Sequence, residues 1–175
     1  MADLSGDTER MKKNRRLALW VAASIFLLDQ ALKWVVRFPL QLEQRLTIEL
    51  LPFFTLRWLK NTGVSMGLFN AGSELGRWLL VALTFAIAAF VAFWMWREKR
   101  RDDAVALALV LGGALGNILD RVRLGYVVDY ADLHFGDIHP FLVFNVADAA
   151  ITIGVLLLLV RALLTREPKA PKEDK

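Results

Sequence analysis

The chain has 175 residues, a formal net charge of +4 and an apolar content of 56%, which is high for an ordinary soluble domain. Its basic residues form short clusters beside long apolar runs, so we expect membrane lipid as a partner and no nucleic acid. Because cysteine is absent, the chain has no disulfide, no thiol nucleophile and no thiolate metal site.

Four apolar segments are candidates for membrane spans, since a bilayer core of about 30 Å needs about 20 residues of helix. These segments are 17–36, 78–96, 104–119 and 141–160. The third is short, and we expect Asp120 and Arg121 to continue its helix. Gly112 and Gly116 in this segment allow close helix contact. The pattern predicts an all-α polytopic membrane protein with a four-transmembrane-helix bundle.

Lysine and arginine are distributed unevenly around these segments. Five lie in residues 1–16, four in 97–101 and five from residue 161 onward, which together make 14 of the 22. The positive-inside rule places them in the cytoplasm, together with both termini. We therefore expect 1–16 to be a cytoplasmic basic tail, 17–164 a membrane domain, and 165–175 a disordered cytoplasmic tail.

The two remaining connections are expected on the outer face of the membrane. In the longer one, apolar and polar residues alternate over 46–50 and 55–60, which predicts a small β-sheet over about 40–62. We expect this sheet to lie on the membrane surface, with Trp58 as an interfacial anchor. The shorter connection, about 123–140, is expected to be a loop with a short helix or strand.

Polar residues of different segments are expected at a common depth just below the outer surface of the membrane. They are Asp29, Lys33, Asn117, Asp120, Arg121, Asn145 and Asp148. Charged groups are costly inside a membrane, so such residues by default mark a functional site. Asp148 is seven residues from the start of its segment, which places it about 10 Å deep in a helix. We expect these side chains to face one another inside the bundle.

Structural interpretations of these residues are also open. Asp29 and Lys33, at a spacing of i, i+4, can form a neutralised pair that stabilises helix packing. Asp120 and Arg121 can likewise pair near an interface. Asp148 is harder to explain in this way, because no cation lies three or four residues from it in either direction.

Asp129 and the two histidines lie on the shorter outer connection. By itself Asp129 would be an ordinary loop carboxylate. His134 and His139 are expected to be solvated or interfacial. No group of His, Asp and Glu residues has zinc-like spacing, so we expect no metal site.

Five short motifs occur in order along the chain. They are Asp29-Gln30-x-x-Lys33, Asn61-Thr62-Gly63, Gly116-Asn117-x-x-Asp120-Arg121, Val127-Val128-Asp129 and Phe144-Asn145-x-Ala147-Asp148. In this order, on a four-span chain, they resemble lipoprotein signal peptidase (signal peptidase II) over about residues 17–160. One departure is visible: after the second motif the family often has small residues and then Phe, whereas this chain has Val64-Ser65-Met66-Gly67. We expect altered packing there and unchanged chemistry.

The resemblance implies an aspartyl endopeptidase of the bacterial inner membrane, with Asp129 and Asp148 as the catalytic pair and no cofactor. It also implies a substrate, a prolipoprotein that carries diacylglycerol on a cysteine and is cut immediately before it, and inhibition by globomycin-type cyclic peptides. The positions with a binding or supporting role are Asp29, Lys33, Asn61, Gly63, Asn117, Asp120, Arg121 and Asn145. We expect the protein to be a monomer.

Two close carboxylates suit this chemistry, because in a low-dielectric site they cannot both ionise easily and one keeps a proton. The pair can then activate a water and also protonate the leaving amine. Asn61, Asn117 and Asn145 are neutral groups that can hold the substrate backbone or the developing oxyanion.

Other function classes are open. An ion-coupled transporter could use Asp29, Lys33 and Asp148 as a relay, although the inner halves of the spans lack further polar residues.

A serine–lysine peptidase could use Ser65 or Ser73 with Lys60. A non-enzymatic assembly factor would need the polar residues only for structure.

Overall fold

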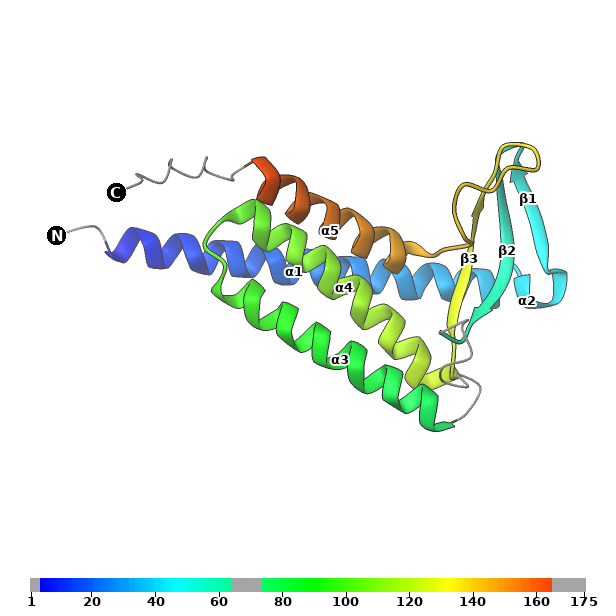
Figure 1. Cartoon of the computed structure of the whole chain (residues 1–175), viewed down its shortest axis with the longest axis horizontal. Helices are drawn as coiled ribbons and strands as arrows, with labels where there is room; N and C mark the ends of the chain where they lie inside the picture. The colour runs from blue at the N-terminus through cyan, green and yellow to red at the C-terminus, as the bar shows by residue number, and fades with distance from the viewer. Residues whose placement is uncertain (1–3, 64–73, 165–175) are drawn as a thin grey trace, which may run out of the picture.

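The computed structural model describes residues 4–63 and 74–164, which form five helices and three strands. In chain order they are α1 (Leu4–Arg37), α2 (Leu42–Arg45), β1 (Thr47–Leu51), β2 (Phe54–Asn61), α3 (Glu74–Arg97), α4 (Arg101–Leu124), β3 (Val127–Leu133) and α5 (Val146–Leu164). The four long helices form a bundle with the sheet at one end (Figure 1). Outside the described residues lie the departure over 64–67, Ser65, Ser73 and the tail 165–175.

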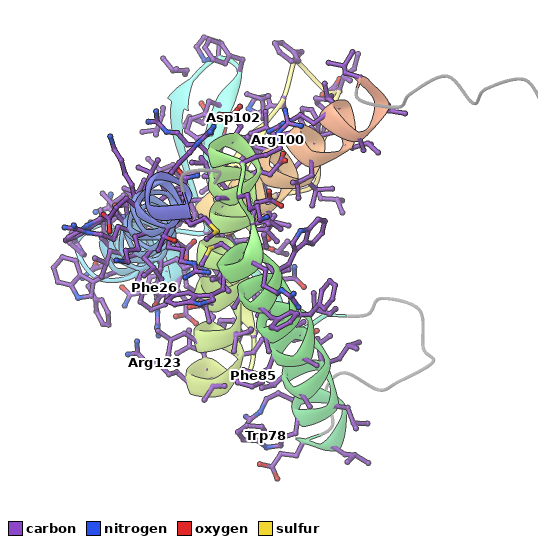
Figure 2. All side chains as sticks on the ribbon, turned by 90° about the vertical axis from the view of Figure 1, so that its left-hand side faces the viewer. Phe26, Trp78, Phe85, Arg100, Asp102 and Arg123 are labelled. Carbon is purple, nitrogen blue, oxygen red and sulfur yellow. The ribbon has the colours of Figure 1, made fainter. Side chains whose placement is uncertain are left out.

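Within the described residues, four helices are long and apolar enough to cross a membrane: α1, α3, α4 and α5. Large apolar side chains such as Trp20, Phe90 and Leu156 are more than half exposed on the outside of the bundle. Figure 2, which looks along the bundle from the end opposite the sheet, shows Trp78 of α3 at its edge. Such a surface suits lipid better than water, so the expected four-span membrane fold is confirmed.

Helix α4 is the centre of the bundle and contacts α1, α3 and α5. Its glycines allow the neighbours to come close. A Cβ on Gly112 would lie 2.5 Å from the carbonyl oxygen of Ala22 in α1, and a Cβ on Gly113 would clash with the carbonyl oxygen of Ala147 in α5. The expected close helix contact at Gly112 is thus present.

The sheet has the order β1-β2-β3, with both pairs antiparallel. The predicted sheet over 40–62 supplies β1 and β2, with the short helix α2 before them. The connection over 123–140, expected as a loop with a short helix or strand, supplies β3. This strand pairs Asp129 with Leu59 and Val127 with Asn61, and its residues 127–132 are buried. Asp129 therefore lies on a buried strand and not on a loop.

Two helix boundaries differ from the expected segments. Helix α5 begins at Val146 and not near residue 141, because Phe144 is extended and exchanges backbone hydrogen bonds with Ala131. Asp148 therefore lies in the first turn of α5, about 3 Å along the helix axis from Val146, and not two turns into the helix as expected.

Helix α1 already begins at Leu4, so most of the basic segment 1–16 is helical. Asn14 and Arg15 of this segment donate hydrogen bonds to the carbonyl oxygens of Lys99 and Trp96, at 2.9 and 2.8 Å.

Candidate active site

Two aspartates from different elements lie on either side of one asparagine. The side-chain amide of Asn145 donates to Asp129 Oδ1 at 2.7 Å, and its backbone N–H donates to Asp148 Oδ2 at 3.2 Å. Asp129 is 1% exposed, and Asp148 is partly buried. The structure therefore brings together the two carboxylates that the sequence suggested as a pair.

The start of α5 explains why Asn145 and Asp148 are held so closely. Asn145 Oδ1 accepts the backbone N–H of Asp148 at 2.9 Å, while the Asp148 carboxylate accepts the backbone N–H of Asn145. This reciprocal pair is a capping box, which satisfies two N–H groups at the helix start. The positive end of the helix dipole also favours a carboxylate here. The Asn-x-x-Asp spacing thus begins the helix and presents Asp148.

Asn61, at the end of β2, holds the other side of Asp129. Its side-chain amide donates to Asp129 Oδ2 at 2.9 Å, while its Oδ1 accepts the backbone N–H of Gly63 at 3.0 Å. Gly63 has φ of +99°, a conformation that L side chains rarely adopt. The glycine therefore allows the turn whose N–H orients Asn61.

Asn117 of α4 makes the matching contact with the second aspartate. Its amide donates to Asp148 Oδ1 at 2.8 Å. Its Oδ1 accepts hydrogen bonds from Lys33 Nζ at 3.1 Å and from the amide of Asn145 at 3.3 Å. Asn117 thereby connects the aspartate pair to the buried lysine of α1.

The three asparagines share one arrangement. In each, the amide oxygen faces a group that only donates: the Gly63 N–H, the Lys33 ammonium or the Asp148 N–H. The NH2 group must then point at a carboxylate. All four carboxylate oxygens of Asp129 and Asp148 therefore accept hydrogen bonds.

A buried ion-pair network lies behind these asparagines. Lys33 Nζ is 2.8 Å from Asp29 Oδ2 and 2.8 Å from Asp120 Oδ2, and all three side chains are at most 5% exposed. Asp29 also accepts the N–H of Ala147, and Asp120 accepts that of Val128. The network thus links α1 and α4 to the start of α5 and to β3.

This network corrects two structural interpretations. Asp29 and Lys33 do not form a closed pair, since Lys33 also binds Asp120. In the described residues Asp120 forms its ion pair with Lys33, and Arg121 has no ion pair with it. Arg121 instead donates a long hydrogen bond of 3.5 Å to the carbonyl oxygen of Asn117.

Gln30 belongs to the same network, although its sequence context alone predicted no binding or supporting role for it. Its amide nitrogen lies 3.1 Å from both Asp29 Oδ2 and Asp120 Oδ1, and 3.3 Å from the carbonyl oxygen of Gly116. A Cβ on Gly116 would lie 2.5 Å from Asp29 Oδ2, so this glycine makes room for the carboxylate. The only feature of the sequence that pointed to Gln30 was its position between Asp29 and Lys33 in the first motif.

The histidines expected to be solvated have partners. His139 Nδ1 lies 2.9 Å from Oδ1 of Asp132, which is 1% exposed, and Arg57 Nε lies 3.1 Å from its Oδ2. His134 Nε2 lies 3.0 Å from Thr55 Oγ1. This cluster fixes the connection after β3 to the sheet. His139 is exposed and His134 is partly exposed, in agreement with the expectation of solvated or interfacial histidines.

The surroundings of Asp129 change its protonation. Burial, and next the charge of Asp148, raise the pKa of Asp129 to about 6, against the hydrogen bonds of Asn61 and Asn145. Asp129 therefore gains and loses its proton near neutral pH, which is a property of general acid–base groups.

An apolar cavity of about 300 Å³ adjoins Asp148. Asp148 lines it together with apolar side chains of α5 and of the preceding segment, among them Phe141, Leu142 and Ile153. A carboxylate at the wall of such a cavity can reach a polar bond in an otherwise apolar ligand.

Lys60, which the serine–lysine alternative needed, is 47% exposed and pairs with Glu43 at 2.6 Å. An exposed, ion-paired lysine is poorly suited to act as a base.

The chain is similar to known proteins along most of its length. The family model described as signal peptidase (SPase) II matches residues 21–164. Lipoprotein signal peptidases from Rhizorhabdus wittichii and Sphingopyxis alaskensis are 62% and 59% identical; the matches cover 92% and 91% of this chain, and 94% and 91% of the relatives. One from Pseudomonas putida is 36% identical, over 91% of this chain and 94% of its own.

Two solved structures described as bacterial membrane enzymes have a similar fold. They superpose with TM-scores of 0.70 and 0.74 at 26% and 27% sequence identity. The matches cover 91% and 86% of this chain, and 94% of each solved chain.

Proposed function

This chain belongs to the signal peptidase II family, and from that premise we propose that it is an aspartic endopeptidase that cuts lipidated prolipoproteins immediately before the modified cysteine. Membership makes it a bacterial multi-pass membrane protease with a prolipoprotein substrate. The observation that supports the aspartyl mechanism is the position of Asn145, whose two N–H groups bind Asp129 and Asp148 at once.

In the proposed reaction the two carboxylates share one proton across a water molecule. The ionised carboxylate takes a proton from the water as its oxygen attacks the scissile carbonyl carbon, while the protonated carboxyl donates to the carbonyl oxygen. Collapse of the tetrahedral intermediate breaks the C–N bond and transfers a proton to the leaving amine. The pKa of Asp129, raised to about 6, supports an aspartate that can hold and release the shared proton near that pH.

The proposed orientation places the sheet end at the periplasm. The clusters of basic residues at Arg10–Arg16 and Arg97–Arg101 lie toward the opposite end of the bundle, as the positive-inside rule requires of the cytoplasmic side (Figure 1). A diacylglyceryl-cysteine keeps its acyl chains in the outer leaflet, so its peptide bond lies near the level at which α5 begins. The apolar cavity beside Asp148 then receives apolar parts of the substrate.

The test is cleavage of a diacylglyceryl-modified precursor peptide by the purified protein, with products identified by mass spectrometry. Asp129→Asn and Asp148→Asn should each lower the rate by at least about 10²–10⁴-fold, the usual contribution of a general acid or base. Both variants should remain folded and membrane-inserted.

Asp132→Asn is the matched control. Asp132 lies on the same strand as Asp129 and is equally buried at 1% exposure, but it binds His139 and Arg57. We expect the control to keep cleavage within about tenfold of wild type, since it leaves both carboxyl groups of the proposed catalytic pair in place. Near-normal cleavage by either dyad variant would exclude the proposed pair.

A further inference from the structure

A small cavity lined by both charged and apolar side chains lies between the sheet-side ends of α1 and α4. Its volume is about 50 Å³, several times the about 10–15 Å³ that one water needs. Lys33 and Asp120 form part of its wall, so it adjoins the ion-pair network, and Arg37 and Arg123 line it as well.

The charges around this cavity do not balance. Lys33 already shares Asp29 and Asp120, and neither Arg37 nor Arg123 has an ion pair in the part of the chain that the structure describes. Arg37 instead stacks over the ring of Phe38 at 5.4 Å. Two guanidinium groups that converge on one small cavity beside a membrane are unfavourable without an anion.

The aromatic side chains of this cavity indicate that it lies at the level of lipid headgroups. Trp34 and Phe38, which also line it, are 58% and 57% exposed, with ring centroids 6.0 Å apart. Exposed aromatic residues near the end of a spanning helix are typical of the membrane–water interface. Arg123 lies in the last turn of α4, and Figure 2 shows it pointing away from α3.

We propose that this cavity binds the phosphodiester headgroup of an anionic phospholipid, with Arg37 and Arg123 as its ligands. Guanidinium groups present paired N–H donors that match phosphate oxygens. The exposed rings of Trp34 and Phe38 lie where the glycerol and acyl part of such a lipid would run. These rings favour a lipid over free phosphate, which needs no apolar surface.

A consequence for catalysis rests on the proposed peptidase function. The cavity reaches Lys33 and Asp120, and Lys33 in turn binds Asn117, which donates to Asp148. A headgroup in the cavity therefore balances the charges of Arg37 and Arg123 and stabilises the neighbouring network that orients Asn117. Cleavage should be faster in bilayers that contain the anionic lipid.

The binding test uses the full chain in phosphatidylcholine nanodiscs with and without phosphatidylglycerol. Phosphatidylglycerol retained after detergent extraction is counted by native mass spectrometry. Arg37→Gln and Arg123→Gln should each lower retention at least roughly tenfold, the loss expected for a charge-assisted contact. Arg45→Gln is the matched control, since Arg45 of α2 is also exposed and has no ion pair among the described residues. The control should retain lipid like wild type.

If all three variants retain as much phosphatidylglycerol as wild type, the proposal is overturned. Arg37 and Arg123 would then serve only to stabilise the C-terminal ends of α1 and α4. A further arm adds inorganic phosphate to phosphatidylcholine nanodiscs. In one outcome, phosphate raises the Tm of the protein as much as phosphatidylglycerol does, and Arg123→Gln abolishes this rise. That result would overturn the proposal of a lipid ligand and identify a small oxyanion as the ligand.

Cleavage is measured separately in the same nanodiscs. Absence of cleavage in every lipid, with lipid retention intact, would contradict the peptidase function and leave the lipid site standing. Equal cleavage with and without phosphatidylglycerol would overturn only the catalytic consequence.

Discussion

Lys33→Met removes the ammonium that Asp29 and Asp120 share while keeping most of the side-chain length. Both contacts are 2.8 Å, and the carboxylates are 0% and 5% exposed, so their charges would be left buried without a cation. Breaking a buried ion pair in this way costs about 3–5 kcal/mol. For a chain of this size each kcal/mol lowers Tm by about 2–4 °C, so we expect a drop of at least about 6 °C.

Lys60→Met is the matched control. Lys60 is as close to its partner, at 2.6 Å from Glu43, but the two side chains are 47% and 42% exposed. An exposed pair contributes about 0–1 kcal/mol, so its loss should lower Tm by no more than about 4 °C. Tm is read from the protein that stays monodisperse after heating in one detergent. Equal drops in Tm for Lys33→Met and Lys60→Met would refute the claim that burial makes the Lys33 ion pairs more stabilising than the exposed one.

Lys33→Met/Asp120→Asn separates the two roles of Lys33. Asp29, Lys33 and Asp120 together carry a net charge of −1, which becomes −2 in the single variant and −1 again in the double variant. Stability should recover in part, while cleavage stays low because no ammonium orients the Asn117 amide. If cleavage recovers together with stability, Lys33 contributes only the ion pair.

Two further outcomes are expected. Burial and the Asp148 charge raise the pKa of Asp129 from 3.8 to about 6, so the folded chain binds this proton more tightly than the unfolded chain. That stabilisation is complete below about pH 4 and is lost as pH rises through 6; wild type should therefore lose more Tm between pH 4 and 7 than Asp129→Asn, and parallel curves would contradict this. Gly116→Ala, whose Cβ would meet Asp29 Oδ2 at 2.5 Å, should lower both Tm and cleavage. In Gly136→Ala the added Cβ meets no atom of the described residues within 4 Å, so the change should cost only the backbone strain of its φ of +61°.

The spans and the convergence of polar residues were predictable, because both depend on local spacing and on the cost of charges in lipid. Asn117 and Asp120 share a helix face by periodicity alone, and the structure places both in the network. The motif with Asn145 and Asp148 was likewise readable as a pair, although the helix start between them was misplaced.

Contacts between segments that lie far apart in the chain were harder to predict from the sequence. The pairing of β3 with β2 joins residues more than 60 positions apart, and it alone places Asp129 on a buried strand beside Asn61. The pairing of Asp120 with Lys33, and not with Arg121, depends on how α1 and α4 are rotated against each other. The same holds for Asp132 and His139, whose contact follows from the path of the chain after β3.

Hydrophobic length, basic clusters and helical spacing thus determined that this chain crosses a membrane and that its acids lie near one face. Those features are local, since each depends on residues within a few turns of one another. Only the tertiary structure decided that Asn61, Asn117 and Asn145 turn their NH2 groups toward the two aspartates, because each amide is oriented by its own separate donor.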